Sequence, residues 1–441
     1  MSIKGEFKMW NTYKKTISVL FIVFLLYPIA AHSTDYYVST TGSDSNSGTL
    51  TLPWKTVQKA ATTMVAGDTA YVRGGTYSEY MIKFSNSGSS GSPITIKGYT
   101  GETAVIDGMG SSVADGRRPV FDIDGVSYIT LDGLTIKRGA TANVYISYNH
   151  AGSTHDITIR NCDMQDFVAN DNSGHVLLGT GSDNIIIENN HLHGVQGYHN
   201  NASGLFVAYS LTVTIKNNEI HDTNIGIYWK SGYDNSNITT IENNLIYNQT
   251  RWGVNLNHRG IIFRNNVVRD VTGIGVLVFE ESNICANLIS VDMQILHNTV
   301  VRTGGGSIVL DRSTLCEGAK NTVVRDNLIY NFTSPSLRGV AVYAYYSSDS
   351  SNTTFDHNLI YSDSYSSPIR VLSSYYTTAT APLTGTGNIQ QSPNFRNYTN
   401  NDFTLQPSSP GRHSASDSTD VGANISLVGI NAAPASPPTV Q

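Results

Sequence analysis

The chain has 441 residues, of which only 14% are charged, against about 25% in an average globular domain. So few charges disfavour helical bundles, coiled coils and basic nucleic-acid-binding modules, whose exposed faces carry many charges. With 39% apolar residues, 39 Gly, 40 Asn and only 13 Pro, the chain can build a core and is not a Pro-rich disordered polymer. The net charge of -6 names no partner by itself.

The first 33 residues have the layout of a secretory signal. An apolar run over residues 17–29 ends in Ala-Ala-His-Ser, and four lysines precede it: Lys4, Lys8, Lys14 and Lys15. We expect cleavage near residues 31–33, and therefore a protein that is secreted or at the cell surface, with a periplasmic location also compatible. The alternative is an uncleaved anchor, although about 15 apolar residues are short for a membrane span. Removal of residues 1–33, which carry four Lys and one Glu, makes the charge about -9.

One segment near the N-terminus has the period of an amphipathic helix. It covers residues 53–64 (PWKTVQKAATTM), and a strand and turn follow it in the sequence GDTAYVRGGTYSE. We expect this helix to cover the open end of the first coil of the domain described next, because exposed sheet edges invite aggregation.

A repeat organises the chain from residue 129 onward. Each unit has a short apolar–polar alternation followed by two residues that are often Asn-Asn, and the second residue of that pair occurs at positions 134, 162, 190, 218, 244, 266, 298, 327 and 358. Units of 22 to 32 residues hold about three short strands with turns, and no helical segment separates them, which excludes a βαβ sheet. Each unit completes its core only by stacking on its neighbours. We therefore predict an all-β, parallel β-solenoid of about ten coils over residues 34–424, with a ladder of Asn side chains at one turn.

The three cysteines are interpreted from their places in the repeat. Cys285 and Cys316 occupy matching positions in consecutive coils, which lie about 4.8 Å apart. An exported protein permits a disulfide between them, and the alternative is two unpaired loop thiols. Cys162 occupies an Asn position of the ladder, so we expect a buried, inert thiol.

The two ends of the predicted domain resemble those of a known superfamily. The opening segment just described and the closing segment NDFTLQPSSPGRHSASDSTDVGA are similar to those of secreted right-handed parallel β-helix proteins of the pectate-lyase-like superfamily. The resemblance covers about residues 35–424 and implies a right-handed coil. It does not imply one activity, because this fold carries lyases, hydrolases, epimerases and phage adhesins. Residues 425–441, which end in APASPPTVQ, are predicted to be a C-terminal tail.

The last strand of each coil can be aligned, and alternate residues then point outward. One outward column is expected to hold Asp122, Tyr145, Leu177, Phe206, Tyr228, Asn255, Leu277 and Val309. The other is expected to hold Asp124, Ser147, Gly179, Ala208, Lys230, Asn257, Phe279 and Asp311. Phe206 and Tyr228 would be adjacent exposed aromatics, which suit the apolar faces of sugar rings.

Four basic residues are expected to converge beside these columns from two adjacent coils: Lys230, Arg251, His258 and Arg259. Further substrate contacts are predicted from residues next to them: Asn255, Asn257, His199, Glu280 and Arg312. The alternative is that these are scattered, solvated charges. Four histidines bear on metal binding. The spacing of His191, His193, His199 and His221 does not match a typical zinc motif, so we expect turn and strand-edge roles for them.

A basic group of this kind suits β-elimination in a uronic acid polymer. The enzyme must neutralise the carboxylate, stabilise the enolate-like state and supply a base. Arg can bind a carboxylate with two hydrogen bonds, and Lys can act as the base if its pKa falls. Hydrolysis instead needs two carboxylates at a set separation, and the best candidates, Glu280 and Asp311, lie on successive coils.

A narrower resemblance concerns two coils. The segments YWKS, with Lys230, and GVNLNHRG, with His258 and Arg259, are similar to motifs of polysaccharide lyases of family six, which include alginate lyases and chondroitinase B. The resemblance implies that Lys230 is the base. The order here is His-Arg where the family has Arg-His, and Asn257 takes the family's Arg position. Calcium, which that family binds, is a possible cofactor, although only Asp222 and Asn224 lie near the corresponding place.

These observations predict an exported, monomeric polysaccharide lyase that acts on an anionic polymer such as alginate, pectate or a glycosaminoglycan. Nucleotide binding is not expected, because no Gly-rich phosphate-binding motif occurs in a suitable context, and neither is nucleic-acid binding. Two alternatives stay open. One is a non-catalytic, glycan-binding or adhesin-like solenoid, and the other is a glycoside hydrolase that uses Glu280, Glu281 or Asp311.

Overall fold

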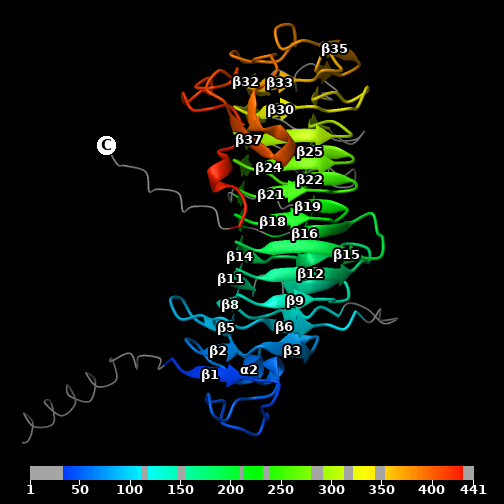
Figure 1. Cartoon of the computed structure of the whole chain (residues 1–441). Helices are drawn as coiled ribbons and strands as arrows, with labels where there is room; N and C mark the ends of the chain where they lie inside the picture. The colour runs from blue at the N-terminus through cyan, green and yellow to red at the C-terminus, as the bar shows by residue number, and fades with distance from the viewer. Residues whose placement is uncertain are drawn as a thin grey trace, which may run out of the picture.

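The computed structural model describes residues 33–110, 118–146, 154–208, 210, 212–231, 239–279, 292–311, 321–342 and 353–430. The fold is a right-handed parallel β-solenoid, as predicted, and the number of coils differs slightly from ten (Figure 1). Nearly all of the predicted signal segment lies outside the described residues. No helix within the described ranges is long and apolar enough to cross a membrane.

Each coil contributes one strand to each of three long sheets, which we name A, B and C. Sheet A contains β1 (Asp35–Val38), β2 (Thr69–Val72), β5 (Ile94–Gly98), β8 (Ile129–Asp132), β11 (His155–Arg160), β14 (Asp183–Glu188), β17 (Val213–Lys216), β20 (Thr239–Glu242), β23 (Ile261–Arg264), β26 (Gln294–Leu296), β29 (Val323–Arg325) and β32 (Thr354–Asp356). Sheet B contains β3 (Gly75–Ser78), β6 (Ala104–Asp107), β9 (Thr135–Lys137), β12 (Asp163–Val168), β15 (His191–Gln196), β18 (Glu219–His221), β21 (Leu245–Tyr247), β24 (Val267–Val271), β27 (Thr299–Thr303), β30 (Leu328–Tyr330) and β33 (Leu359–Tyr361).

Sheet C contains β4 (Ile82–Lys83), β7 (Phe121–Ile123), β10 (Ala142–Ile146), β13 (Ser173–Leu178), β16 (Ala202–Ala208), β19 (Ile225–Ser231), β22 (Trp252–Leu256), β25 (Ile274–Val278), β28 (Ile308–Leu310), β31 (Val340–Val342), β34 (Ile369–Val371) and β35 (Ser374–Tyr376). Neighbouring strands of the three sheets are parallel, except that β35 runs antiparallel to β34. A small hairpin of β36 (Phe395–Asn397) and β37 (Asp402–Leu405) encloses the 3-10 helix η2 (Tyr398–Asn400).

The core lies inside the coil and is built from stacked columns of β-branched and other apolar residues. In sheet A, one register column places the same kind of side chain on each successive coil: Ile96, Leu131, Ile159, Ile187, Ile215, Ile241, Phe263, Ile295, Val324 and Phe355. All of them are buried. The period-two pattern thus buries one residue in two, and the column continues only because the coils stack in register.

The predicted Asn ladder is confirmed. Each Asn side chain donates its Nδ2–H to the Oδ1 of the next Asn, as in the 3.0 Å bonds from Asn190 to Asn218 and from Asn218 to Asn244. The ladder continues through Asn266, Asn298, Asn327, Asn358 and Asn388. The residue before the ladder position has a positive φ, such as 54° at Asn189, which Asn tolerates better than most residues.

Cys162 takes the ladder position below Asn190, as predicted. Its backbone N–H donates to Asn190 Oδ1 at 2.9 Å. The thiol is 2% exposed, and burial raises the pKa of Cys162 to about 12. It is therefore a buried thiol that stays protonated near neutral pH.

The predicted capping helix is α2 (Val57–Thr63), shorter than the segment 53–64. It begins after Thr56, whose hydroxyl accepts the N–H of Lys59 at 3.1 Å. The first two residues of the predicted segment, 53 and 54, cannot join the helix, because Trp54 pairs with Val38 next to β1. The first two N–H groups of the helix donate to the carboxylate of Glu79, and these two bonds tie the capping helix to the first coils.

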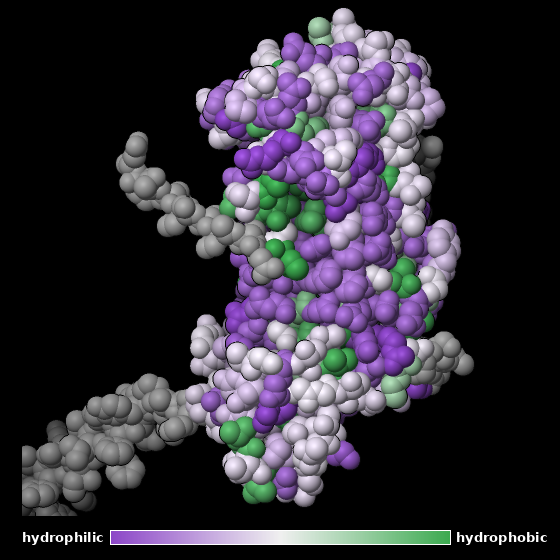
Figure 2. Space-filling view, in the orientation of Figure 1, coloured by the Kyte–Doolittle hydropathy of each residue, from purple (hydrophilic) through white to green (hydrophobic). Residues whose placement is uncertain are grey.

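Residues 415–430 form a strap, which we name the C-terminal strap, and it runs back along the coils (Figure 1). Its contacts reach successively earlier coils: Ser416 with Asp326, Ala423 with Thr299, Asn424 with Asn265, and Gly429 with Asn243. The strap includes the 3-10 helix η3 (Ile425–Leu427), so residues 425–430 of the predicted tail lie against the solenoid. It covers outward-facing apolar residues of sheet B such as Val267 and Leu328. Figure 2 shows apolar atoms gathered around this strap on an otherwise largely hydrophilic face.

Candidate functional site

The outer face of sheet C has the column that the sequence predicts. The registers place Leu177, Phe206, Tyr228, Asn255 and Leu277 on consecutive strands. The rings of Phe206 and Tyr228 meet edge to face, with centroids 5.3 Å apart. The adjacency of these two aromatics is therefore confirmed.

The prediction that these aromatics are exposed is wrong, because each is only 3% exposed. They belong to a second apolar cluster on the outer side of the sheet, whose other members are Ala142, Tyr145, Leu177, Ala208, Ile225 and Trp252. Alternation along a strand determines that a side chain points out of the coil, but it does not determine whether other residues cover it. Neither ring offers a free surface on which a sugar could stack in this structure.

Lys230 lies at an irregularity of sheet C. Val207 pairs with Trp229, but the next residue, Ala208, pairs with Ser231, so Lys230 is the extra residue of a β-bulge. Trp229 is fully buried in the core, whereas Lys230 is partly exposed. A bulge re-aims a side chain and is over-represented next to active sites. Alternation along β19 already places Lys230 outward, and the bulge adds a local break in the strand at this residue.

Lys230 is joined to Arg251 through two amide side chains. Lys230 Nζ donates to Asn172 Oδ1 at 3.1 Å, and Asn201 Nδ2 donates to the same oxygen at 3.0 Å. Arg251 Nη1 donates to Asn201 Oδ1 at 3.3 Å and to the carbonyl of Asn200 at 3.0 Å. We name Lys230, Asn172, Asn201 and Arg251 the Lys–Arg network.

Asn172 and Asn201 were not among the residues predicted from the sequence. Both lie directly before strands of sheet C, β13 and β16, as Arg251 does before β22. This shared place in the coil is the signal that could have found them. Asp171 and His199 border the network, since Asn201 Nδ2 also donates to Asp171 Oδ1 at 3.0 Å and His199 Nδ1 lies 3.7 Å from that oxygen.

The two cations of the network are not neutralised by any carboxylate of the described residues. Most other described Lys and Arg side chains on the coils form ion pairs, for example Lys216 with Glu188 and Arg264 with Glu242. Arg251 instead lies over the ring of Trp252, with its guanidinium carbon 3.7 Å from the centroid. Within the described residues, two positive charges without an ion-pair partner on one face of an acidic chain suit an anionic ligand.

His258 and Arg259 do not join Lys230 and Arg251, so the predicted convergence of four basic residues is only half right. His258 is fully buried, its ring centroid lies 5.0 Å from that of Trp229, and its Nδ1–H donates to the carbonyl of Arg259. Burial lowers the pKa of His258, which favours the neutral ring. Arg259 Nε donates to Asp292 Oδ2 at 2.9 Å, next to sheet A. The chain alternates here, so His258 points inward.

The remaining predicted contacts are divided between the network and its surroundings. Asn257 is buried and donates to the backbone carbonyl of Lys230 at 2.8 Å, so it supports the bulge. Asn255 is buried beside Tyr228, and its Oδ1 has no hydrogen-bond partner among the described residues. Five residues with predicted roles lie outside the described ranges, and those roles stay predictions: Glu280, Glu281, Arg312, Cys285 and Cys316.

The residues proposed for calcium do not fit a shared site. Asp222 Oδ2 accepts from His221 Nδ1, and its Oδ1 accepts from Asn248. Asn224 is buried, and its amide donates to the carbonyl of His199. The two side chains thus have separate partners, and no step is derived through calcium. The described ranges hold one group of three or more His, Cys, Asp or Glu side chains that could share a metal ion, namely His191, His193 and His221.

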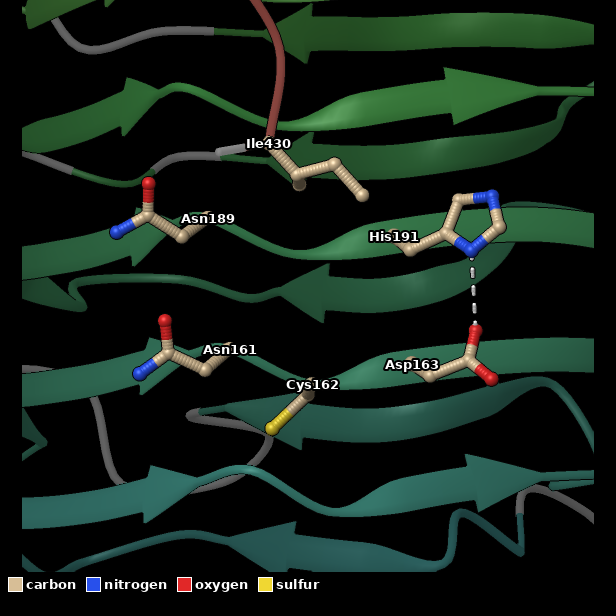
Figure 3. A pocket seen from close by; sticks show the side chains of 6 residues that line it. All are labelled: Asn161, Cys162, Asp163, Asn189, His191 and Ile430. Atoms are coloured by element: carbon tan, nitrogen blue, oxygen red, sulfur yellow. Dashed lines mark ion pairs between the residues drawn. The ribbon is translucent and has the colours of Figure 1, made fainter. Parts of the chain in front are cut away.

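An open pocket of about 430 Å³ lies beside one member of that group (Figure 3). Its lining residues are Asn161, Cys162, Asp163, Asn189, His191 and Ile430. Ile430 is the last described residue of the C-terminal strap, so the pocket begins where the strap ends on sheet B.

Comparisons with known proteins agree with this fold. Residues 36–214 match the family model described as Pel9A-like, right handed beta helix region. The chain is 27% identical over 467 aligned positions to "Uncharacterized protein YwoF" of Bacillus subtilis (strain 168). The alignment covers 86% of this chain and 92% of that protein. It is 30% identical over 172 positions to pectate lyase PEL9 of Emericella nidulans, but this covers only 37% of this chain and 40% of that protein.

Two solved structures are similar over most of the chain. Pectate lyase Pel9A has a TM-score of 0.59 at 16% identity, with 89% of this chain and 96% of that chain covered. The family PL6 alginate lyase AlyGC, in a mutant form, has a TM-score of 0.57 at 15% identity, with 92% of this chain and 60% of that chain covered. At this identity the likeness shows the fold alone, and it agrees with the predicted right-handed parallel β-helix.

Proposed function

We propose that this chain, whose first coils match the Pel9A-like β-helix model, is an exported polysaccharide lyase that cleaves a uronic-acid-containing polymer by β-elimination. The observation that carries the proposal is the Lys–Arg network. It places a primary amine and a guanidinium on the outer side of sheet C, joined by Asn172 and Asn201 and without a described carboxylate partner. The names of the relatives, a pectate lyase and an alginate lyase among them, support the reaction class.

Arg251 is suited to bind the uronate carboxylate. Its Nη1 is occupied by Asn200 and Asn201, and the contact with Trp252 fixes the plane of the group. The remaining N–H groups can donate to a carboxylate, and a guanidinium does so with two parallel bonds. Neutralising the carboxylate makes the adjacent C5–H more acidic, because the developing negative charge moves onto the carboxylate oxygens.

Lys230 is suited to remove the C5 proton. Asn172 Oδ1 accepts a hydrogen bond from Nζ and thereby fixes the direction of the amine, while Asn257 holds the backbone of the bulge. In the elimination the C5–H bond breaks, a C4=C5 double bond forms, and the C4–O bond to the next sugar breaks. The leaving oxygen takes a proton from solvent water, and Lys230 carries the proton from C5.

The test measures the formation of the C4=C5 double bond. Untagged protein from residue 34 onward is incubated with polygalacturonate, alginate, rhamnogalacturonan and chondroitin sulfate, with and without added calcium. We expect ultraviolet absorbance from the unsaturated uronate and new reducing ends to rise together on one of these polymers. Reducing ends without the absorbance would instead indicate a hydrolase, and binding without turnover would indicate a non-catalytic solenoid.

Export is part of the same proposal. It is supported by the lysine-rich start and apolar run of residues 1–33. Expression of the whole chain in a secreting bacterial host, followed by N-terminal sequencing of the protein outside the cytoplasm, would identify the cleavage position. A protein that stays in the cytoplasm at full length would contradict export. The outcome of the lyase assay does not depend on this result.

A further inference from the structure

Three imidazoles gather on the outer face of sheet B, away from the Lys–Arg network of sheet C. His191 and His193 are alternate residues of β15, so both point to the same side of the sheet. His221 on β18 is the register partner of His193, and Asp163 on β12 is the register partner of His191. The coil therefore assembles the group from three consecutive strands.

The ligand atoms lie at metal-binding separations. Nε2 of His191 lies 2.8 Å from Nε2 of His221, and one nitrogen from each of the three rings lies within 4.8 Å of the others. With metal–nitrogen bonds of about 2.0–2.1 Å, two nitrogens of a tetrahedral site lie about 3.3 Å apart. Rotation of the side chains would bring the three nitrogens around one ion.

Carboxylates hold the opposite nitrogen of two of these rings. His221 Nδ1 lies 2.6 Å from Asp222 Oδ2, and His191 Nδ1 lies 3.3 Å from Asp163 Oδ1 (Figure 3). A histidine that binds a metal usually donates its other N–H to a carboxylate or carbonyl, which fixes the tautomer. With Nδ1–H directed at the carboxylates, the two neutral rings present bare lone pairs to each other at 2.8 Å. That arrangement is repulsive unless a proton or a cation lies between the two nitrogens.

The group is held in place yet accessible. His193 stacks on His191 with centroids 4.1 Å apart and on His221 with centroids 5.2 Å apart, and His221 stacks on Tyr247. The three histidine side chains are partly exposed. The pocket beside His191 and Asp163 provides an entry path for an ion.

We propose that His191, His193 and His221 bind one divalent transition metal ion and thereby clip the neighbouring coils of β15 and β18 together. Asp163 Oδ1 lies 3.0 Å from His193 Nε2, so a bound ion would replace this contact. Imidazole-rich sites of this kind take zinc, copper, nickel or cobalt ions, whereas calcium and magnesium prefer oxygen ligands. The role is structural, and it does not depend on the proposed lyase reaction.

The probes are Co²⁺ and Zn²⁺ added to untagged, chelator-treated protein from residue 34 onward. We expect one equivalent of Co²⁺ to give a visible absorption band that Zn²⁺ abolishes, and one equivalent of Zn²⁺ to raise the midpoint of thermal unfolding. Asp222→Asn keeps all three imidazoles and is expected to weaken Zn²⁺ binding about 10- to 100-fold. His221→Asn should abolish the saturable band. Absence of one-equivalent binding in the wild-type protein would overturn the proposal.

The chain offers a matched control. His155 and Asp156 form the same pair at the same distance, 2.6 Å between Nδ1 and Oδ2, on the outer side of sheet A. His155 is not a member of the three-histidine group. His155→Asn should therefore leave the affinity and the thermal shift unchanged. Equal loss of binding in His155→Asn and His221→Asn would also overturn the assignment, since it would indicate scattered binding to surface histidines.

Discussion

The guanidinium carbon of Arg251 lies 3.7 Å from the ring centroid of Trp252, its neighbour in sequence. This contact and the bonds to Asn200 and Asn201 fix the guanidinium, so its remaining N–H groups have a set direction. A lysine keeps the charge but not the paired donors. We expect Arg251→Lys to raise KM for the polymer about 10- to 100-fold, the equivalent of one lost charged hydrogen bond. Initial rates across substrate concentrations measure it, with Arg264→Lys on sheet A as control. An unchanged KM would contradict the role.

Lys230→Arg tests the base directly. Arginine retains a positive charge at the bulge but does not give up its proton near neutral pH. We expect kcat to fall about 10²- to 10⁴-fold, the usual contribution of a general base, with little change in KM. Lys216→Arg, which changes a lysine paired with Glu188 on sheet A, should have wild-type rates. Retention of kcat in Lys230→Arg, with a normal circular dichroism spectrum, would remove Lys230 from the mechanism.

Asn172→Asp tests the positioning of the amine. Residue 172 has a φ of 53°, which Asp tolerates about as well as Asn, so the backbone should be unaffected. A carboxylate 3.1 Å from Nζ favours the protonated, inactive amine. We therefore expect the rising limb of the pH–rate profile to move to higher pH. A uniformly lower rate at every pH, without that displacement, would indicate only structural damage.

Asn244→Ala tests the ladder. The side-chain amide of Asn244 donates to the carbonyls of Ile215 and Glu242 and to Oδ1 of Asn266. Its Oδ1 accepts from the backbone N–H and from the Nδ2–H of Asn218. Each buried group left without a partner costs about 1–3 kcal/mol, so the free energy of unfolding should fall by at least about 2 kcal/mol. Urea unfolding measures it. The control is Asn400→Ala, which changes an exposed Asn in η2. It should lower the free energy of unfolding by less than about 0.5 kcal/mol.

His175 predicts a pH dependence of stability. Its ring is fully buried and packs on Phe167, and burial lowers the pKa of His175 from 6.5 to about 3. The unfolded chain therefore takes up a proton first as the pH falls. The stabilisation from the neutral buried ring is complete above about pH 6.5 and is lost progressively towards pH 3.

Replacing His175 by Gln removes this titration. The free energy of unfolding should then depend less steeply on pH between 6 and 4, by up to about 1.4 kcal/mol per pH unit. Urea unfolding at several pH values measures the slope. His155→Gln, at a partly exposed site, serves as the control. Identical slopes for His175→Gln and wild type would show that His175 does not titrate between the two states.

The coil was predictable because its determinants are local and repeat. Alternating apolar residues gave the strands, and the Asn pairs marked the turn that became the ladder, including the buried place of Cys162. The aligned column of Phe206 and Tyr228 was also correct. Their exposure was not, because it depends on residues from other coils that pack on the outer face of the sheet.

The site was harder to predict because its members come from different coils. Lys230 bonds to Asn172, 58 residues earlier, and no short motif encodes that contact. His258, just after β22, was misplaced because the inward and outward alternation of the strand continues past its end. The three-histidine group was missed for a related reason. The spacing of its residues along the chain does not match a zinc motif, but the step from His193 to His221 equals one coil. In the same way, Asp163, His191 and Glu219 share one register column. Aligning the coils would have brought it out.

The C-terminal strap changes how this stack should come apart. Coils of a solenoid contact only their neighbours, so such a molecule behaves as a one-dimensional array in which terminal units can fray one after another. The strap bonds to residues of four separate coils, at Asp326, Thr299, Asn265 and Asn243. None of these coils can peel away without releasing it. The strap therefore makes the loss of the later coils a single cooperative event.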